Sequence, residues 1–333
     1  MDSCDPDGAS LPRRGIAGCV KEKSYWGVFT INFQAVSLSD KPVFDRYFHE
    51  KYYEGSECNF TTLFMWRKGY SIRWTIEEDF FYILAAYDNM PYMLPPYGLS
   101  THSEESFMRA VDRAIEYFSA NGIAFSMRGV SSVVVERLER LRPGFFKVEP
   151  RREVFDYVYN VKDLMELKGK NYRNKVNHIN SFKREYSQYE YLPLSAELVP
   201  ECIEYELEWC AQRECEGDLS LLMEREAIME ALKHYDQLGF KGGVIKINGK
   251  VEAFTLGEQL NSDTAVIHVE KGNPDIRGIY PIINQEFLRN TWSHMKFVNR
   301  EEDMGIEGLR IAKESYRPVK LVEKYEVTLQ TGC

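Results

Sequence analysis

The chain has 333 residues, a length that suits two domains of roughly 150 residues better than one. Hydrophobic residues make up 44% of it and charged residues 28%, which excludes an intrinsically disordered or fibrous protein. Its 42 basic and 51 acidic side chains give a net charge of −9, which argues against a surface that binds nucleic acid over its whole area. A local basic site remains compatible with this total.

Neither targeting signals nor cysteine patterns in the sequence point to a particular function. The sequence has no apolar run of about 18–20 residues, the length of a membrane-spanning helix, and residues 1–10 do not resemble a signal peptide. The seven cysteines are odd in number, and none are paired at CxxC spacing. We therefore expect a cytoplasmic protein without a metal site or a disulfide framework, in which Cys202, Cys210 and Cys215 are small buried residues.

The first half is predicted to be mixed α/β. Residues 1–30 are rich in Gly, Pro, Ser and Asp, and we expect a flexible extension there. The elements expected after it are a helix over 38–51, a hairpin over 71–87, a helix over 103–122, a strand over 123–130, a helix over 131–141 and a strand over 152–161. Residues 59–70 leave helix and loop open, and the three prolines within 90–98 predict a loop.

The second half is predicted to repeat this alternation. The expected helices are 167–186, 196–214, 219–238, 279–292 and 305–316, and the expected strands are 189–194, 241–247, 250–260, 263–271, 296–299 and 320–329. Asn248-Gly249 is the strongest short hairpin signal in the chain. From residue 241 the order is hairpin, third strand, helix, strand, helix, strand, which is the order of the GNAT acyltransferase core.

A narrower resemblance is carried by four segments: EAFTLGE, IHVEKGNPDIRGIYPIINQEF, NREEDMGIEGLRIAKESYRP and, upstream, GKNYRNKVNHINSF. They resemble the phosphatidylglycerol lysyltransferase C-terminal-domain family, over about residues 31–330. The resemblance implies two GNAT-like halves in tandem, related in fold to the FemABX ligases. It also implies aminoacyl transfer, in which the ester carbonyl of a charged tRNA 3′ end meets a hydroxyl or amine nucleophile between the halves.

The first candidate site is a basic segment. Residues 168–184 contain six basic side chains and no acidic one, a local charge of +6 that suits a polyanion such as a tRNA acceptor end, CoA or a lipid phosphate. The alternative is a solvated helix face that pairs with the acidic helices. The candidate binding residues here are Lys168, Lys170, Arg173 and Asn177.

The second candidate site is the end of the strand over 263–271. Strand alternation predicts that His268 and Glu270 lie on the same side, beside the loop before the next helix. Glu270 is a candidate catalytic base or a ligand for a substrate amine, with a salt bridge to Lys271 or Arg277 as the alternative. That loop keeps Arg277 and one glycine of the usual GNAT phosphate loop, [Q/R]xxGxG/A, so His268, Asn273 and Arg277 are candidate binding residues.

The third candidate site is the charged loop over 299–303 and the helix after it, because α/β sites usually lie at strand ends. Asn299, Arg300, Glu301, Arg310 and Lys313 are candidate binding residues there, and Asp303 is a candidate catalytic residue. In many GNAT enzymes the corresponding helix carries a tyrosine that protonates the leaving group, and the resemblance implies this role for Tyr316. Helix capping and i,i+3 pairing are the alternative.

The sequence therefore predicts a tandem GNAT-like α/β protein, with an N-terminal half over 31–155 that shapes a cleft and a C-terminal half over 156–333 that carries the donor site. The predicted function is acyl transfer from aminoacyl-tRNA, or from acyl-CoA, to a hydroxyl or amine acceptor such as a small molecule or a lipid headgroup. No covalently bound cofactor is expected, and the chain is expected to be a monomer or weak dimer. The alternatives are a non-catalytic module that binds an anionic metabolite or a partner and, third, an ordinary acetyl-CoA N-acetyltransferase.

Overall fold

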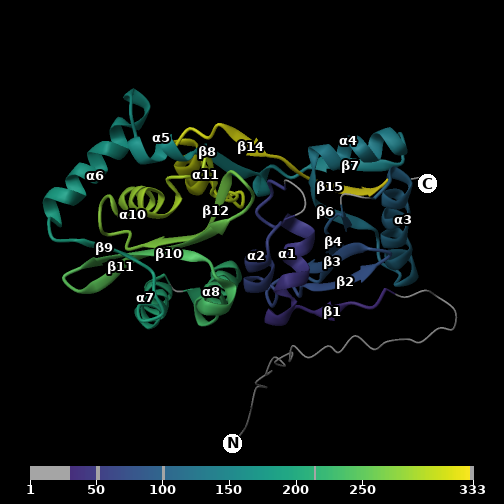
Figure 1. Cartoon of the computed structure of the whole chain (residues 1–333), viewed down its shortest axis with the longest axis horizontal. Helices are drawn as coiled ribbons and strands as arrows, with labels where there is room; N and C mark the ends of the chain where they lie inside the picture. Colours follow the sequence, from purple (N-terminus) through teal and green to yellow (C-terminus); the bar gives the residue numbers. More distant parts are fainter. Residues whose placement is uncertain (1–30, 50–52, 100–101, 214, 331–333) are drawn as a thin grey trace, which may run out of the picture. The chain divides into compact units, whose positions relative to one another are not determined.

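The computed structural model describes residues 31–49, 53–99, 102–213 and 215–330, so the extension expected over residues 1–30 lies outside the described residues. The described chain forms two mixed β-sheets flanked by helices, which confirms the predicted mixed α/β, tandem GNAT-like fold (Figure 1). No helix in the described ranges has both the length and the apolar character needed to cross a membrane.

The first sheet is built largely from the N-terminal half. Its strands, in spatial order, are β1 (Gln34–Ala35), β2 (Arg73–Glu77), β3 (Phe80–Tyr87), β4 (Met90–Met93), β6 (Ser126–Ser131), β15 (Lys324–Leu329) and β7 (Phe146–Pro150), and β5 (Tyr97–Gly98) pairs with β3. Its helical segments are η1 (Leu38–Asp40), α1 (Lys41–His49), α2 (Phe60–Met65), α3 (Glu104–Ala120) and α4 (Ser132–Leu141). Ser103 caps α3, whose apolar face is buried against the sheet.

The second sheet carries the candidate sites. Its strands, in spatial order, are β14 (Lys320–Val322), β8 (Asp156–Asn160), β13 (Phe297–Asn299), β12 (Thr264–Gly272), β11 (Lys250–Gln259), β10 (Lys241–Ile247) and β9 (Glu190–Pro193). Its helices are α5 (Val161–Glu166), α6 (Arg173–Glu185), α7 (Val199–Gln212), α8 (Leu219–Lys233), α9 (Tyr235–Leu238), α10 (Ile279–Phe287) and α11 (Glu307–Glu314). Four short helical turns complete it: η2 (Arg152–Val154), η3 (Lys170–Tyr172), η4 (Cys215–Gly217) and η5 (Leu288–Trp292).

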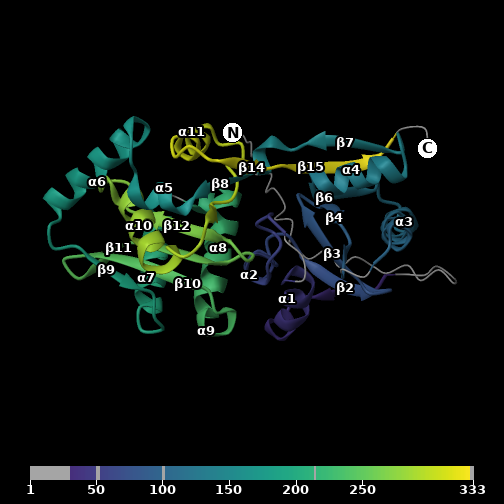
Figure 2. The same cartoon turned by 45° about the horizontal axis from the view of Figure 1, so that its top comes forward.

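One strand of the second half belongs to the first sheet. After β7 the chain leaves the first sheet and enters the second as β8, between β13 and β14; after β14 it returns to the first sheet as β15, between β6 and β7. Figures 1 and 2 show β15, in yellow, among the strands of the first half. The prediction of one strand over 320–329 within the second half is therefore wrong, because the chain changes sheets at Glu323.

One further difference between the predicted and the observed elements has a simple physical reason. The proline-rich segment 90–98 forms β4 and β5 instead of a loop. It tolerates Pro91 because β4 pairs with β6 only at Met93, so the missing N–H of Pro91 breaks no bond to that neighbour.

Cys210 and Cys215 form a disulfide, with their Cα atoms 5.3 Å apart, and are not the separate buried cysteines that we expected. Cys202 is buried and free.

One apolar core contains residues of both halves. Phe44, Phe60 and Phe81 of the first half pack in the same cluster as Ile228 and Phe254 of the second. A second cluster lies under α6 and α10, and a third lies under α3. Cys58, in the loop before α2, belongs to this shared cluster, and the same loop contacts Asn299 at the end of β13.

Candidate functional site

A β-bulge at His268 divides the candidate residues of β12 between the two faces of the sheet. Leu256 pairs with Val269 and Gly257 pairs with Ile267, so His268 is the extra residue. Ile267 packs in the cluster around α10, whereas Val269 packs in the core shared with the first half. The prediction that His268 and Glu270 lie on one side is therefore wrong, because the bulge interrupts the alternation on which it depended.

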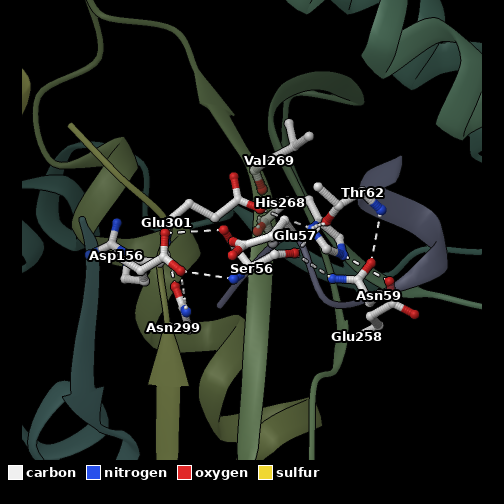
Figure 3. Close-up of polar contacts among 12 residues, drawn as sticks. Ser56, Glu57, Asn59, Thr62, Asp156, Glu258, His268, Val269, Asn299 and Glu301 are labelled. Atoms are coloured by element: carbon white, nitrogen blue, oxygen red, sulfur yellow. Dashed lines mark hydrogen bonds and ion pairs between the residues drawn. The ribbon is translucent and has the colours of Figure 1, made fainter. Parts of the chain in front are cut away.

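His268 lies in a buried polar cluster where the two halves meet (Figure 3). Its Nε2 is 3.0 Å from Glu258 Oε1, and its Nδ1 is 3.1 Å from Glu301 Oε1 and 3.3 Å from the hydroxyl of Thr62 in α2. Burial opposes the charged imidazolium, but the hydrogen bonds to the two carboxylates outweigh it and raise the pKa of His268 to about 9. His268 thus joins two strand ends to the first half as a protonated group.

The Glu270 carboxylate is held on the opposite face of β12. Its Oε1 accepts a hydrogen bond from Arg300 Nη2 at 2.8 Å, and its Oε2 accepts one from Asn284 of α10 at 3.0 Å. Arg300 is thus the partner of Glu270, in place of the expected Lys271 or Arg277. The Lys271 ammonium instead lies 2.7 Å from Glu224 and 3.7 Å from the centroid of a Trp209 ring.

Arg300 and Tyr316 complete this second cluster. The Arg300 guanidinium lies 4.8 Å from the Tyr316 ring centroid, and its Nη1 is buried without a hydrogen-bond partner among the described residues. Burial raises the pKa of the Tyr316 phenol well above its usual range. The structure thus brings together three predicted site residues, Glu270, Arg300 and Tyr316.

Lys175 joins the same cluster, although our sequence analysis did not select it as a site residue. Its ammonium lies 4.0 Å from the Tyr316 ring centroid. The sequence signal that could have identified Lys175 is its position in α6. Lys175 precedes the buried residues Ile179 and Phe182 at spacings of four and seven, so it is a lysine on the apolar side of an amphipathic helix.

Asp303 makes its contacts elsewhere in the loop. Its buried carboxylate accepts hydrogen bonds from the Tyr157 hydroxyl at 2.6 Å, from Arg310 at 2.8 and 3.0 Å, from Arg152 at 3.2 Å and from the Gly305 amide at 2.8 Å. Burial opposes ionisation, but the bonds from Arg310, Tyr157 and Gly305 hold the pKa of Asp303 well below its usual range. This carboxylate has the surroundings of an anchor for the loop and for α11.

Three other predicted residues hold the same loop from within. Asn299 donates to Asp156 Oδ2 and to the Glu54 carbonyl, both at 3.0 Å. Lys313 donates to the backbone carbonyls of Arg300 and Glu301. Glu301 has a positive φ of 56°, and its backbone N–H donates to Asn299 at 2.8 Å. These contacts fix the backbone that carries Arg300.

A groove of about 630 Å³ lies between α6 and the loop before α10. Its lining residues are Asn177, Asn180, Ser181, Lys183, Arg184 and Arg277. Asn177 and Arg277 were predicted as binding residues. The other predicted residues of the basic segment do not line the groove: Lys168 pairs with Glu166, and Lys170 and Arg173 are exposed. Asn273 orders the loop by binding Glu252 and the Asp275 amide.

The start of α10 differs from an open phosphate-binding helix end. Ile279 N–H already donates to the Ile276 carbonyl, and Pro281 has no N–H to offer. Gly278 has φ +90°, and a Cβ at this position would lie 2.5 Å from the His178 carbonyl oxygen. Helix α6 therefore packs directly on the residue that precedes α10.

Sheet order, the bulged third strand and the strand parallel to it define a protein of the tandem GNAT-like acyltransferase fold. The chain belongs to the family described as phosphatidylglycerol lysyltransferase, C-terminal, whose model matches residues 51–328.

The chain is also similar to three individual proteins. A conserved protein of unknown function from Bacteroides thetaiotaomicron is 34% identical in a solved structure, with a TM-score of 0.84 over 90% of this chain and 100% of that one. L-PGS from Bacillus licheniformis is 13% identical, with a TM-score of 0.56 over 85% of this chain and 95% of that one, and shows the fold alone. An uncharacterized protein of Mycoplasmoides gallisepticum is 27% identical over 52% of this chain, and the match spans only 55% of that relative's length.

Proposed function

We propose that this protein transfers an aminoacyl group from an aminoacyl-tRNA to a hydroxyl or amine acceptor. The observation that carries the proposal is the placement of α6. This one helix lines the basic groove and also brings Lys175 beside Arg300 and Glu270. Burial and then the charges of Arg277 and Lys175 lower the pKa of His178, which lies between the two sites along α6.

The chemistry of the groove suits a sugar–phosphate backbone. Lys183, Arg184 and Arg277 supply cations, while Asn177, Asn180 and Ser181 supply hydrogen-bond donors and acceptors for phosphate and ribose oxygens. The start of α10, with two of its backbone donors removed, is a poor cradle for the pyrophosphate of CoA. This combination favours the 3′ end of an RNA over acyl-CoA as the donor.

The cluster beyond the groove suits attack on an ester. In acyl transfer the carbonyl oxygen gains negative charge, and a buried donor that needs no reorganisation stabilises it. Arg300 Nη1 is such a donor, because Glu270, itself held by Asn284, binds the guanidinium through Nη2 and leaves Nη1 without a partner among the described residues. The names of the family and of L-PGS suggest a glycerol hydroxyl of phosphatidylglycerol as one acceptor to test.

The proposal is tested with RNA minihelices that carry [14C]lysine or [14C]alanine at the 3′ end. We expect binding that weakens with salt, and transfer of label to vesicles of phosphatidylglycerol or to an added small amine. Lys183→Glu combined with Arg277→Glu should abolish binding, whereas Lys233→Glu, an exposed change in α8, should not. Failure of both minihelices to bind at low salt would overturn the proposal.

Other outcomes separate the alternatives. Arg300→Met should lower kcat by about 10²–10³-fold while RNA binding persists. Binding without any release or transfer of label would contradict catalysis and leave a binding module. Transfer from acyl-CoA that resists the groove substitutions would contradict the RNA donor.

A further inference from the structure

Lys175 is unusual among the lysines of the basic segment because its side chain is partly buried. Its Nζ lies 4.0 Å from the centroid of the buried Tyr316 ring, and the Arg300 guanidinium lies 4.8 Å from the same ring. Within the described residues no ion pair joins Lys175 to a carboxylate. Most lysines in proteins are solvated or paired, so this ammonium is held in a costly position.

The charged and titratable groups that face Lys175 come from several elements. Arg300, after β13, repels the ammonium, and Glu270 of β12 attracts it but is already bonded to Arg300 and Asn284. Tyr316 lies against it, and His178 lies one turn further along α6. Burial and then the Arg300 charge lower the pKa of Lys175 to about 8. About a tenth of the side chains are therefore neutral amines at pH 7.

We propose that Lys175 is the catalytic base of the transfer reaction. This inference rests on the proposed function. Lys175 Nζ takes the proton from the acceptor hydroxyl or amine while the acceptor attacks the ester carbonyl, and Arg300 Nη1 donates to the carbonyl oxygen. The bond from the carbonyl carbon to the ribose oxygen then breaks. The proton passes from Lys175 to that oxygen, so the tRNA leaves with a free hydroxyl and Lys175 returns to the amine.

The neighbouring groups are less suited to this role. Both oxygens of Glu270 already accept hydrogen bonds. Lys313 donates to two backbone carbonyls, and burial places the pKa of Tyr316 too high for a neutral-pH base. A base must have a lone pair free of hydrogen bonds and titrate near the working pH, and Lys175, whose ammonium contacts the face of the Tyr316 ring, meets both conditions.

A first experiment tests Lys175 without any substrate. Wild-type protein is labelled with limiting acetic anhydride from pH 6 to 11, and the modification of each lysine is measured by mass spectrometry. We expect Lys175 to reach half of its maximal reactivity near pH 8, whereas the exposed Lys233 does so above about pH 10. Parallel titration of the two lysines would overturn the proposal and leave the proposed function untouched.

A second experiment uses the charged minihelix assay. Lys175→Arg keeps the positive charge but removes the base, so kcat should fall by about 10²–10³-fold with little change in RNA affinity. The wild-type profile of kcat should rise to a plateau near pH 8, and this step should vanish in Lys175→Arg; Lys233→Arg should behave as wild type. A full rate for Lys175→Arg, or a step below pH 6.5 that indicates His178, would overturn the assignment. Absence of transfer in the wild type would contradict the proposed function instead.

Discussion

The ammonium of Lys324 lies 2.7 Å from Asp156 Oδ1, and these two residues begin β15 and β8, the strands that follow the two passages of the chain between the sheets. Asp156 is fully buried and also accepts from the Ser56 backbone at 2.8 Å and from Asn299 at 3.0 Å. Burial opposes the charge on Lys324, but Asp156, Glu57 and Glu302 raise its pKa well above the usual range. The pair locks the two crossing points together at the boundary between the halves.

We expect Lys324→Met to lower the free energy of unfolding by about 3–5 kcal/mol, because it leaves the Asp156 carboxylate buried without its cation. Urea denaturation measures this loss. The matched control is Lys147→Met, which removes an exposed lysine paired with the exposed Glu149 and should cost less than about 1 kcal/mol. Equal losses for the two variants would contradict the buried lock. Adding Asp156→Asn to Lys324→Met should recover part of the loss.

His268 gives the fold a specific dependence on pH. Its pKa rises from 6.5 to about 9 on folding, so its stabilising contribution is complete below about pH 6.5 and is lost as the pH rises through 9. The contribution is on the order of 3 kcal/mol, since each tenfold change in proton affinity corresponds to about 1.4 kcal/mol. Urea midpoints measured from pH 6 to 10 should therefore fall with pH. His268→Gln should remove this slope, whereas His294→Gln, an exposed change, should retain it; a slope that survives in His268→Gln would contradict the assignment.

The close approach of α6 to α10 predicts a large cost for Gly278→Ala. The new Cβ meets the His178 carbonyl, and the residue must also keep φ +90°. We expect the unfolding free energy to fall by about 1 kcal/mol for the conformation and by about 1–3 kcal/mol more for the overlap. Gly249→Ala is the control, because its φ is +80° and nothing lies within 4 Å of the new Cβ. Equal losses for the two variants would show that α6 does not rest on this glycine.

Asp303→Asn should lower the free energy of unfolding. The carboxylate binds two arginines and a buried tyrosine, so we expect a loss of about 1.5–3 kcal/mol. Its pKa is lowered on folding, so this contribution is present above about pH 4 and declines as the pH falls towards the folded value. Acid titration of the wild type and Asp303→Asn by circular dichroism should show a smaller acid loss in the variant. A stable Asp303→Asn protein without transfer activity would instead assign Asp303 to catalysis.

Local signals in the sequence predicted most elements of the fold. The Asn248-Gly249 turn, the Ser103 cap and the apolar period of α3 each depend on neighbouring residues, and each is found where it was expected. The return of β15 to the first sheet was missed because a strand pattern reveals that a segment is extended and not which sheet receives it. The two strands on either side of Glu323 read as one run for the same reason.

The candidate site shows the same limit. Charge density drew attention to α6 and to the loop over 299–303, whose role as a site stays a prediction. The faces of β12 were misassigned because a bulge leaves no mark in a sequence. Pairings such as Glu270 with Arg300 join residues 30 apart, and only the sheet brings them together. Lys175 was not selected from the sequence because its neighbours in the fold, Tyr316 and Arg300, are distant in the chain.

The return of β15 to the first sheet also governs when that sheet can close during synthesis. The first sheet has an unfilled position between β6 and β7 until residues 324–329 emerge from the ribosome, although all of its other strands are made before residue 151. Exposed strand edges bind other chains, so the nascent N-terminal half is at risk of aggregation until these residues are made. A chain arrested before Lys324 should therefore need a chaperone, and synthesis of residues 324–329 should let the first sheet close.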